Sequence, residues 1–179
     1  WMVLSSFKTN GEIQSIVQTL LPQEATIDNY MNLQQTFDFL RYFMNSIFIA
    51  VAVTAIVIYT SCLCGYVLGK YQFKGKNVIF GFVMMTMMVP WSVTIIPRYT
   101  MFMEAGLQDT YISLILPVMV SGFGIFMMKQ NMESIPDELI EAARMDGSNE
   151  FQTFHKLVLP LCKNGISAMA IFQFLWVWE

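Results

Sequence analysis

The sequence predicts an all-α membrane protein, a polytopic bundle of transmembrane helices with one organised polar loop. Of the 179 residues, 55% are hydrophobic and 13% are charged, which is far from the average of soluble proteins. Residues 44–68 contain no charged side chain, whereas residues 133–161 form a polar passage inside an apolar chain. The net charge of −3, with dispersed Lys and Arg, offers no basic surface and argues against a nucleic-acid partner.

The first predicted span is residues 44–68, "MNSIFIAVAVTAIVIYTSCLCGYVL". About 25 residues at ~1.5 Å each cross a ~30 Å hydrocarbon core with some tilt. The apolar runs at 77–97 and 110–128 are predicted as two more spans, and another begins at 165 and continues to 179. That last run is too short to cross, and the first residues resemble the outer end of a span, so we expect a chain truncated at both ends.

Two of these runs contain an internal proline, Pro90 and Pro117. Proline frees a carbonyl one turn earlier in a helix, and a membrane tolerates this only where neighbouring groups or cavity water replace the lost hydrogen bond. The prolines therefore predict bends. Two interpretations stay open, helices bent around a transport pathway and packing kinks without a role in transport.

Basic residues in the short loops predict the orientation, because Lys and Arg are enriched on the cytoplasmic side. Lys70, Lys74 and Lys76 lie in a loop without acids, which we expect to be cytoplasmic. The loop at 98–109 has one Arg against two acids and is expected outside. Residues 129–163 then return to the cytoplasm, so the polar passage faces inward.

The polar passage has start and stop signals for a first helix. Ser134, with Asp137 three residues later, matches a capping box in its acidic form. The helix is expected to continue to Gly147, because glycine readily adopts the left-handed conformation that ends many helices.

A second helix is predicted to follow at once, with either Ser148 or Asn149 as its cap. Phe151, Phe154 and Val158 recur along it at helical spacing before Pro160 interrupts it. The passage is thus predicted to be a helix, a sharp turn and a second helix.

One face of the first helix has small side chains, which favours docking to another protein. Ala142 and Ala143 permit close approach, and Glu141 beside them can supply an orienting ion pair. The alternative is an amphipathic helix on the bilayer surface. Such a helix would carry Leu, Phe or Trp on this face and basic residues around it. Here the face has two Ala instead, and the segment is acidic rather than basic.

No catalytic, cofactor or metal site can be assigned from the sequence. There is no GxxxxGK[ST] phosphate loop, no Ser-His-Asp or Cys-His arrangement, and the single histidine, His155, has no partners in metal-ligand spacing. Cys62, Cys64 and Cys162 are interpreted as small buried hydrophobic residues. We expect this chain to bind no ATP itself.

The segments "EAARMDG" at 141–147 and "KLVLPL" at 156–161 resemble the EAA loop of binding-protein-dependent ABC importer permeases. The stretch at 88–117, "MVPWSVTIIPRYTMFMEAGLQDTYISLILP", resembles the carbohydrate-uptake branch of that family. The resemblance covers essentially the whole chain. Two departures are Ser148, where the family usually has Ala, and Glu179, where an Asn often follows the Trp.

The resemblance implies that residues 1–179 form part of one six-span permease domain in a prokaryotic cell membrane. It implies a second, related permease, two ATPase subunits that bind ATP, and a solute-binding protein as partners. It also implies that the loop at 129–163 contains a coupling helix that docks in a cleft of the ATPase. The residues assigned to docking are Glu141, Ala142, Ala143, Asp146 and Gly147.

The predicted function is ATP-driven import of sugars, polyols or sugar phosphates. One alternative is a permease of this kind for a non-sugar solute. An ion-coupled secondary transporter is a second alternative, although the runs at 44–68, 77–97 and 110–128 lack the ionisable residues that such transporters usually need. A membrane scaffold is a third. Substrate-contacting residues cannot be assigned from the sequence.

Overall fold

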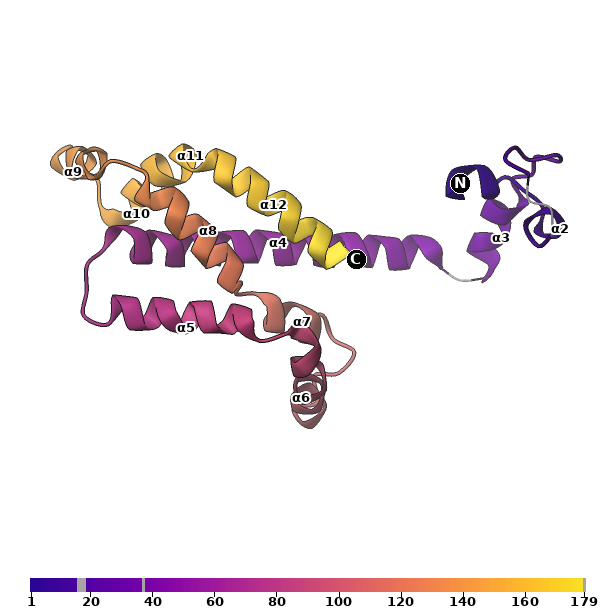
Figure 1. The fold of residues 1–179 in the computed structure, drawn as a ribbon, viewed down its shortest axis with the longest axis horizontal. Helices are drawn as coiled ribbons and strands as arrows, with labels where there is room; N and C mark the ends of the chain where they lie inside the picture. Colours follow the sequence, from indigo (N-terminus) through magenta and orange to yellow (C-terminus); the bar gives the residue numbers. More distant parts are fainter. Residues whose placement is uncertain (16–18, 37, 179) are drawn as a thin grey trace. The chain divides into compact units, whose positions relative to one another are not determined.

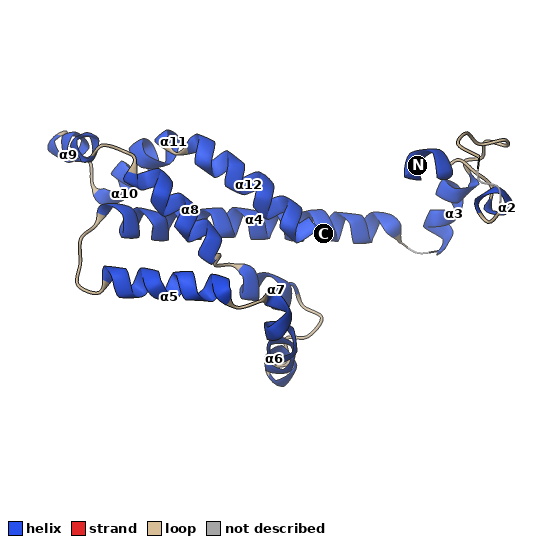
Figure 2. Ribbon diagram, viewed as in Figure 1, coloured by secondary structure: helices blue, strands red, loops and turns tan. Residues whose placement is uncertain are grey.

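The computed structural model describes residues 1–15, 19–36 and 38–178. Over these ranges every regular element is helical and none is a strand (Figure 2), which confirms the all-α prediction. The chain divides into two compact units, Trp1–Ser46 and Ile47–Glu179, and each is described by itself. Glu179, one of the two departures from the family pattern, lies outside the described residues.

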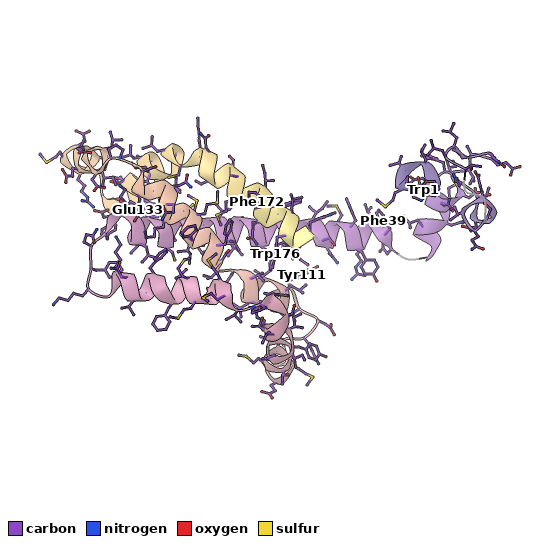
Figure 3. The ribbon with its side chains drawn as sticks, viewed as in Figure 1. Trp1, Phe39, Tyr111, Glu133, Phe172 and Trp176 are labelled. Atoms are coloured by element: carbon purple, nitrogen blue, oxygen red, sulfur yellow. The ribbon has the colours of Figure 1, made fainter. Side chains whose placement is uncertain are left out.

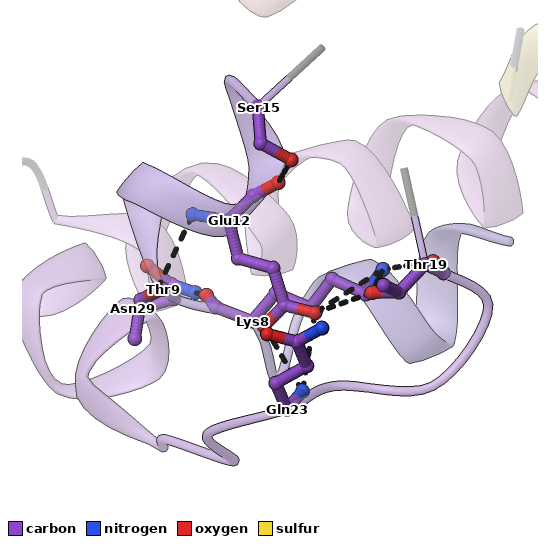
Figure 4. A network of polar contacts seen from close by, with 7 residues as sticks. All are labelled: Lys8, Thr9, Glu12, Ser15, Thr19, Gln23 and Asn29. Atoms are coloured by element: carbon purple, nitrogen blue, oxygen red, sulfur yellow. Dashed lines mark hydrogen bonds and ion pairs between the residues drawn. The ribbon is translucent and has the colours of Figure 1, made fainter. Parts of the chain in front are cut away.

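The first unit contains the short helices α1 (Met2–Ser5) and α2 (Asn10–Ile13) and the helix α3 (Asp28–Thr36). A polar network holds its loops (Figure 4). The Lys8 side chain is buried, and its Nζ donates to the carbonyl oxygen and the hydroxyl of Thr19. The Glu12 carboxylate accepts from the Thr19 hydroxyl at 2.6 Å and from the Gln23 N–H at 3.1 Å. The buried Lys8 ammonium group is thus hydrogen-bonded to its neighbours, as a buried charge must be.

Helix α4 (Phe39–Lys70) contains the predicted span 44–68 and extends beyond it at both ends. Within the described ranges it is the one helix that is long and apolar enough to cross a membrane alone. Three pairs of shorter helices have this length and composition only if each pair is counted as one bent span, which gives up to four spans.

The run at 77–97 forms two helices, α5 (Lys76–Met88) and α6 (Trp91–Glu104), at 96° to each other. Pro90 between them has extended backbone angles. Because proline cannot donate to the preceding turn, the chain changes direction here, as the sequence predicted. The run at 110–128 is also bent, by 46°. The bend lies between the segment formed by α7 (Tyr111–Ile115) and η1 (Leu116–Val118) and the helix α8 (Gly122–Glu133).

Helix α8 (Gly122–Glu133) packs closely on α4 and α12 (Lys163–Trp178) (Figure 1). A Cβ added at Gly65 of α4 would lie 2.8 Å from Met128 Cβ, and one added at Gly124 of α8 would lie 2.3 Å from Ser61 Oγ. Such small residues let membrane helices approach each other. The buried core around these crossings consists mainly of Val53, Val57, Met128, Met132, Phe154, Val158 and Met169.

The polar passage contains α9 (Asp137–Met145), α10 (Glu150–Thr153), the π-helical turn η2 (Phe154–Val158) and α11 (Leu159–Leu161). Helix α12 follows after a bend of 77°. Pro160 lies in the first turn of α11, where its missing N–H costs least. The interruption that the sequence predicted at Pro160 therefore occurs two residues later, at Cys162.

Candidate functional site

The turn between α9 and α10 lies beside the end of α4 that contains Lys70 (Figure 1). Gly147 has φ of +85°, the left-handed conformation. The Ser148 N–H donates to the Ala143 carbonyl and the Gly147 N–H donates to the Arg144 carbonyl, both at 3.0 Å. These two bonds form a Schellman motif, which satisfies carbonyls at the helix end. The sequence-based prediction of a glycine stop at Gly147 is confirmed.

The second helix begins at Asn149, which was one of the two predicted caps. The Asn149 side chain accepts from the Gln152 N–H at 2.8 Å, and the Gln152 side chain accepts from the Asn149 N–H at 3.2 Å. This reciprocal pair is a capping box. The turn from α9 to α10 therefore spans residues 146–149 and is fixed by hydrogen bonds on both sides.

The capping box predicted at Ser134 is wrong. Helix α8 continues to Glu133, so Ser134 is the cap at its end, and its hydroxyl donates to the Asn131 carbonyl at 2.7 Å. Helix α9 begins at Asp137 without a side-chain cap. The gap between the two helices is so short that Ser134 belongs to the end of α8, and the Asp137 carboxylate bonds to a cation instead.

That cation is Lys70 at the end of α4. Its Nζ lies 2.7 Å from Asp137 Oδ1 and also donates to the Ile135 carbonyl oxygen. The Lys70 side chain is 7% exposed, while that of Asp137 is 75% exposed. A charge-assisted bond to a buried ammonium is stronger than one between two solvated side chains. The start of α9 is thereby attached to α4.

Glu150 attaches the other side of the turn to the same helix end. Its carboxylate accepts from Arg144 at 2.9 Å, from the Tyr71 hydroxyl, and from the Tyr66 hydroxyl at 3.3 Å. The Tyr71 hydrogen bond, followed by the charge of Arg144, lowers the pKa of Glu150 against the opposing effect of burial. Sequence reasoning missed Glu150, because the tyrosines that bond to it lie about 80 residues away.

The residues predicted to dock are brought together on the outer side of this unit. Glu141, Ala142, Asp146 and Gly147 are exposed and Ala143 is half-buried, while Ile140 on the opposite side of α9 is buried. The apolar spacing predicted for the second helix holds for Phe154 and Val158, which are buried, but Phe151 is 68% exposed. The loop thus presents an exposed face with small residues and two acids, Glu141 and Asp146.

Comparison with known proteins gives close relatives over the whole chain. The arabinooligosaccharides transport system permease protein AraQ of Bacillus subtilis is 34% identical over 99% of this chain and 64% of its own length. The diacetylchitobiose uptake system permease protein NgcG of Streptomyces coelicolor is 31% identical over 100% of this chain and 60% of its own. The chain therefore spans less than two thirds of the length of these relatives.

A solved structure, "Crystal structure of a bacterial ABC transporter involved in the import of the acidic polysaccharide alginate", has the same fold. The TM-score is 0.89 at 24% identity, over 99% of this chain and 63% of that one. Residues 61–179 also match the family model described as "Binding-protein-dependent transport system inner membrane component". This match includes α8 to α12 and the helix-turn-helix loop, and the chain belongs to that family of inner-membrane transport components.

Proposed function

We propose that the chain is part of a permease subunit that imports saccharides, polyols or sugar phosphates, driven by a separate ATPase. The observation that carries the proposal is the loop from Asp137 to Thr153, a helix-turn-helix attached on both sides to the end of α4. A loop held in this way moves with α4 when it is pushed. Rigid-body movement of packed elements is a common means of switching access between two sides of a protein.

The docking partner is an ATPase cleft that receives α9. Glu141, Ala142, Ala143, Asp146 and Gly147 form the surface that it contacts, since most are exposed and small side chains permit close approach. ATP binds to that partner and not to this chain. The solute is a saccharide or a related compound because the relatives are named for arabinooligosaccharides, diacetylchitobiose and, for UgpE of Pectobacterium atrosepticum, sn-glycerol-3-phosphate. A second permease and a solute-binding protein complete the transporter.

The orientation supports this assignment. Residues 98–104 belong to α6 and not to a loop, but the segment 98–109 still has one Arg against two acids. With residues 70–76 expected in the cytoplasm and residues 98–109 expected outside, α9 and α10 are expected to face the compartment that holds ATP. In the full-length protein, single cysteines in the variants Gln72→Cys and Gln108→Cys are expected to react with an impermeant thiol reagent from opposite sides of the membrane. Labelling of both from the outside would contradict the orientation.

The central test is Glu141→Lys in the complete transporter, with Gln130→Ala as the control. Gln130 is exposed on α8 and outside the docking surface. Glu141→Lys reverses the charge offered to the ATPase, so we expect loss of solute uptake and of ATPase co-purification at normal permease abundance. Wild-type uptake with normal ATPase binding would refute the docking role.

A further inference from the structure

A cavity of about 530 Å³ lies away from the loop, between α5, α6, the start of α8 and α12. Its aromatic wall includes Trp91 of α6 and Phe172 and Trp176 of α12, the last two labelled along α12 in Figure 3. The rings of Trp91 and Trp176 meet edge to face, with centroids 5.5 Å apart. The volume and the apolar lining with a few polar groups are those of a small-molecule site.

Arg98 is the charged residue among the described residues that line this cavity, and no Asp or Glu lies among them. Its guanidinium stacks over the Trp91 ring, 4.0 Å from the ring centroid. Stacking fixes the plane of the guanidinium and leaves its N–H groups directed along its edge. Within the described part of the chain, Nη1 of Arg98 is buried and donates to no acceptor.

A buried cationic donor without an acceptor is costly, because it has lost water and gained no partner. The cost is offset when a ligand supplies oxygen atoms, and a carboxylate or phosphate fits a planar guanidinium best. The Gln173 amide on the same wall can donate to or accept from a hydroxyl. Aromatic walls with these two polar groups suit a sugar ring or a polyol that carries one anionic group.

We propose that this cavity is a binding site for an anionic saccharide or sugar phosphate on its way through the membrane, and that Arg98 selects its anionic group. The inference rests on the proposed function. It assigns the site to the side of the membrane opposite the coupling loop, since Arg98 lies in α6, within the segment 98–109 that is expected outside.

The test uses the full-length permease in its complete transporter, reconstituted with its binding protein in phosphatidylcholine vesicles. Uptake is measured for three radiolabelled solutes: a neutral arabino-oligosaccharide, digalacturonate and glycerol 3-phosphate. The variants are Arg98→Gln, which removes the charge, and Arg98→Lys, which keeps it. Arg41→Gln is the matched control, because Arg41 is an exposed arginine remote from the cavity in sequence.

We expect the wild type to import at least one of the two anions. Arg98→Gln should lower that uptake by about tenfold or more, since loss of a charge-assisted hydrogen bond costs about a tenfold factor or more. Arg98→Lys should retain more of the uptake than Arg98→Gln, and Arg41→Gln should match the wild type. Permease abundance, measured for each variant, separates this effect from misfolding.

A second readout records occupancy rather than transport. In the Gln173→Cys variant, the imported anion is expected to slow labelling of the new thiol, and this protection should disappear when Arg98→Gln is added. Uptake restricted to the neutral sugar, or unchanged anion uptake in Arg98→Gln, would overturn the inference and leave the proposed function standing. A wild-type transporter that moves none of the solutes that its binding protein binds would instead overturn the proposed function.

The headgroup of an anionic lipid could also supply the anionic group that binds Arg98. A second set of vesicles therefore contains phosphatidylglycerol. The solute-binding role predicts the same Arg98→Gln defect in both sets. A defect confined to the vesicles with phosphatidylglycerol would assign Arg98 to a lipid headgroup and refute the proposed site.

Discussion

The coupling loop and the aromatic cavity use charge in opposite ways. At the loop, Lys70 pairs with Asp137 and Arg144 pairs with Glu150, and tyrosine hydroxyls complete the set. At the cavity, Arg98 stacks on an indole but its buried Nη1 has no acceptor within the described residues. Satisfied charges fix one arrangement, whereas an unsatisfied one favours binding of a partner. The comparison thus separates the region that we propose transmits movement from the region that we propose binds solute.

The largest effect is expected from Gly147→Val, at the loop. A left-handed backbone costs an L-residue about 1–2 kcal/mol, and a β-branched side chain fits it worst. A Cβ here meets open space, so the strain is purely conformational and the turn should reorient. We expect uptake by the complete transporter to fall by about tenfold or more, at normal permease abundance.

The control for that prediction is Gly147→Asn, because asparagine tolerates the left-handed region. It should retain most of the uptake. Equal loss in both variants would mean that the side chain, and not the backbone conformation, interferes at this turn.

Gly122→Ala, at the start of α8 beside the cavity, is expected to disturb the packing of α8 on α5. A Cβ there would lie 2.8 Å from Thr86 Oγ1 and 3.1 Å from the Val83 carbonyl oxygen, so α8 and α5 must separate. Overpacking of this kind costs about 1–3 kcal/mol. We expect a lower thermal unfolding temperature of the purified full-length protein, while Gly81→Ala, whose Cβ meets nothing within 4 Å, should change it little. Equal effects in the two variants would argue against this packing contact.

Glu150→Gln should have a smaller effect on stability, because the side chains of Glu150 and of its charged partner Arg144 are about half exposed. The variant keeps the shape of the side chain but loses the negative charge that accepts hydrogen bonds from Arg144, Tyr66 and Tyr71. Exposed pairs contribute about 0–1 kcal/mol each. A double-mutant cycle with Arg144→Gln in thermal unfolding is expected to give a coupling energy of that order, and additive effects would show that the two side chains act separately.

The smallest effect is the pH dependence of the same network. The pKa of Glu150 is lower in the folded protein than its ordinary value, so the folded state favours the carboxylate. Its stabilising contribution is therefore fully present above the unfolded pKa of about 4.3 and is lost as the pH falls through the folded value. The difference in unfolding temperature between wild type and Glu150→Gln should be constant from about pH 7 to 5 and shrink below about pH 4. A difference that grows on acidification would contradict the sign of the shift.

Local chemistry determined much of this protein from the sequence alone. The uncharged run within α4, the bend at Pro90, the left-handed Gly147 and a helix cap at Ser148 or Asn149 follow from hydropathy and backbone preference, which depend on few neighbouring residues. In the structure the cap is Asn149. The family pattern around "EAARMDG" added the expected docking residues. These signals lie within short segments, so one sequence sufficed to find them.

The tertiary structure decided which distant groups meet. Asp137 forms an ion pair with Lys70 instead of the predicted capping box. Tyr66 and Tyr71 donate hydrogen bonds to Glu150, which lies about 80 residues away in the sequence. The cavity likewise joins Trp91 and Arg98 to Trp176. No local pattern encodes such contacts, because they depend on helix crossings set by glycines such as Gly65 and Gly124. The sequence identified the loop, and only the packing of α4, α8 and α12 brought together its attachments and the cavity.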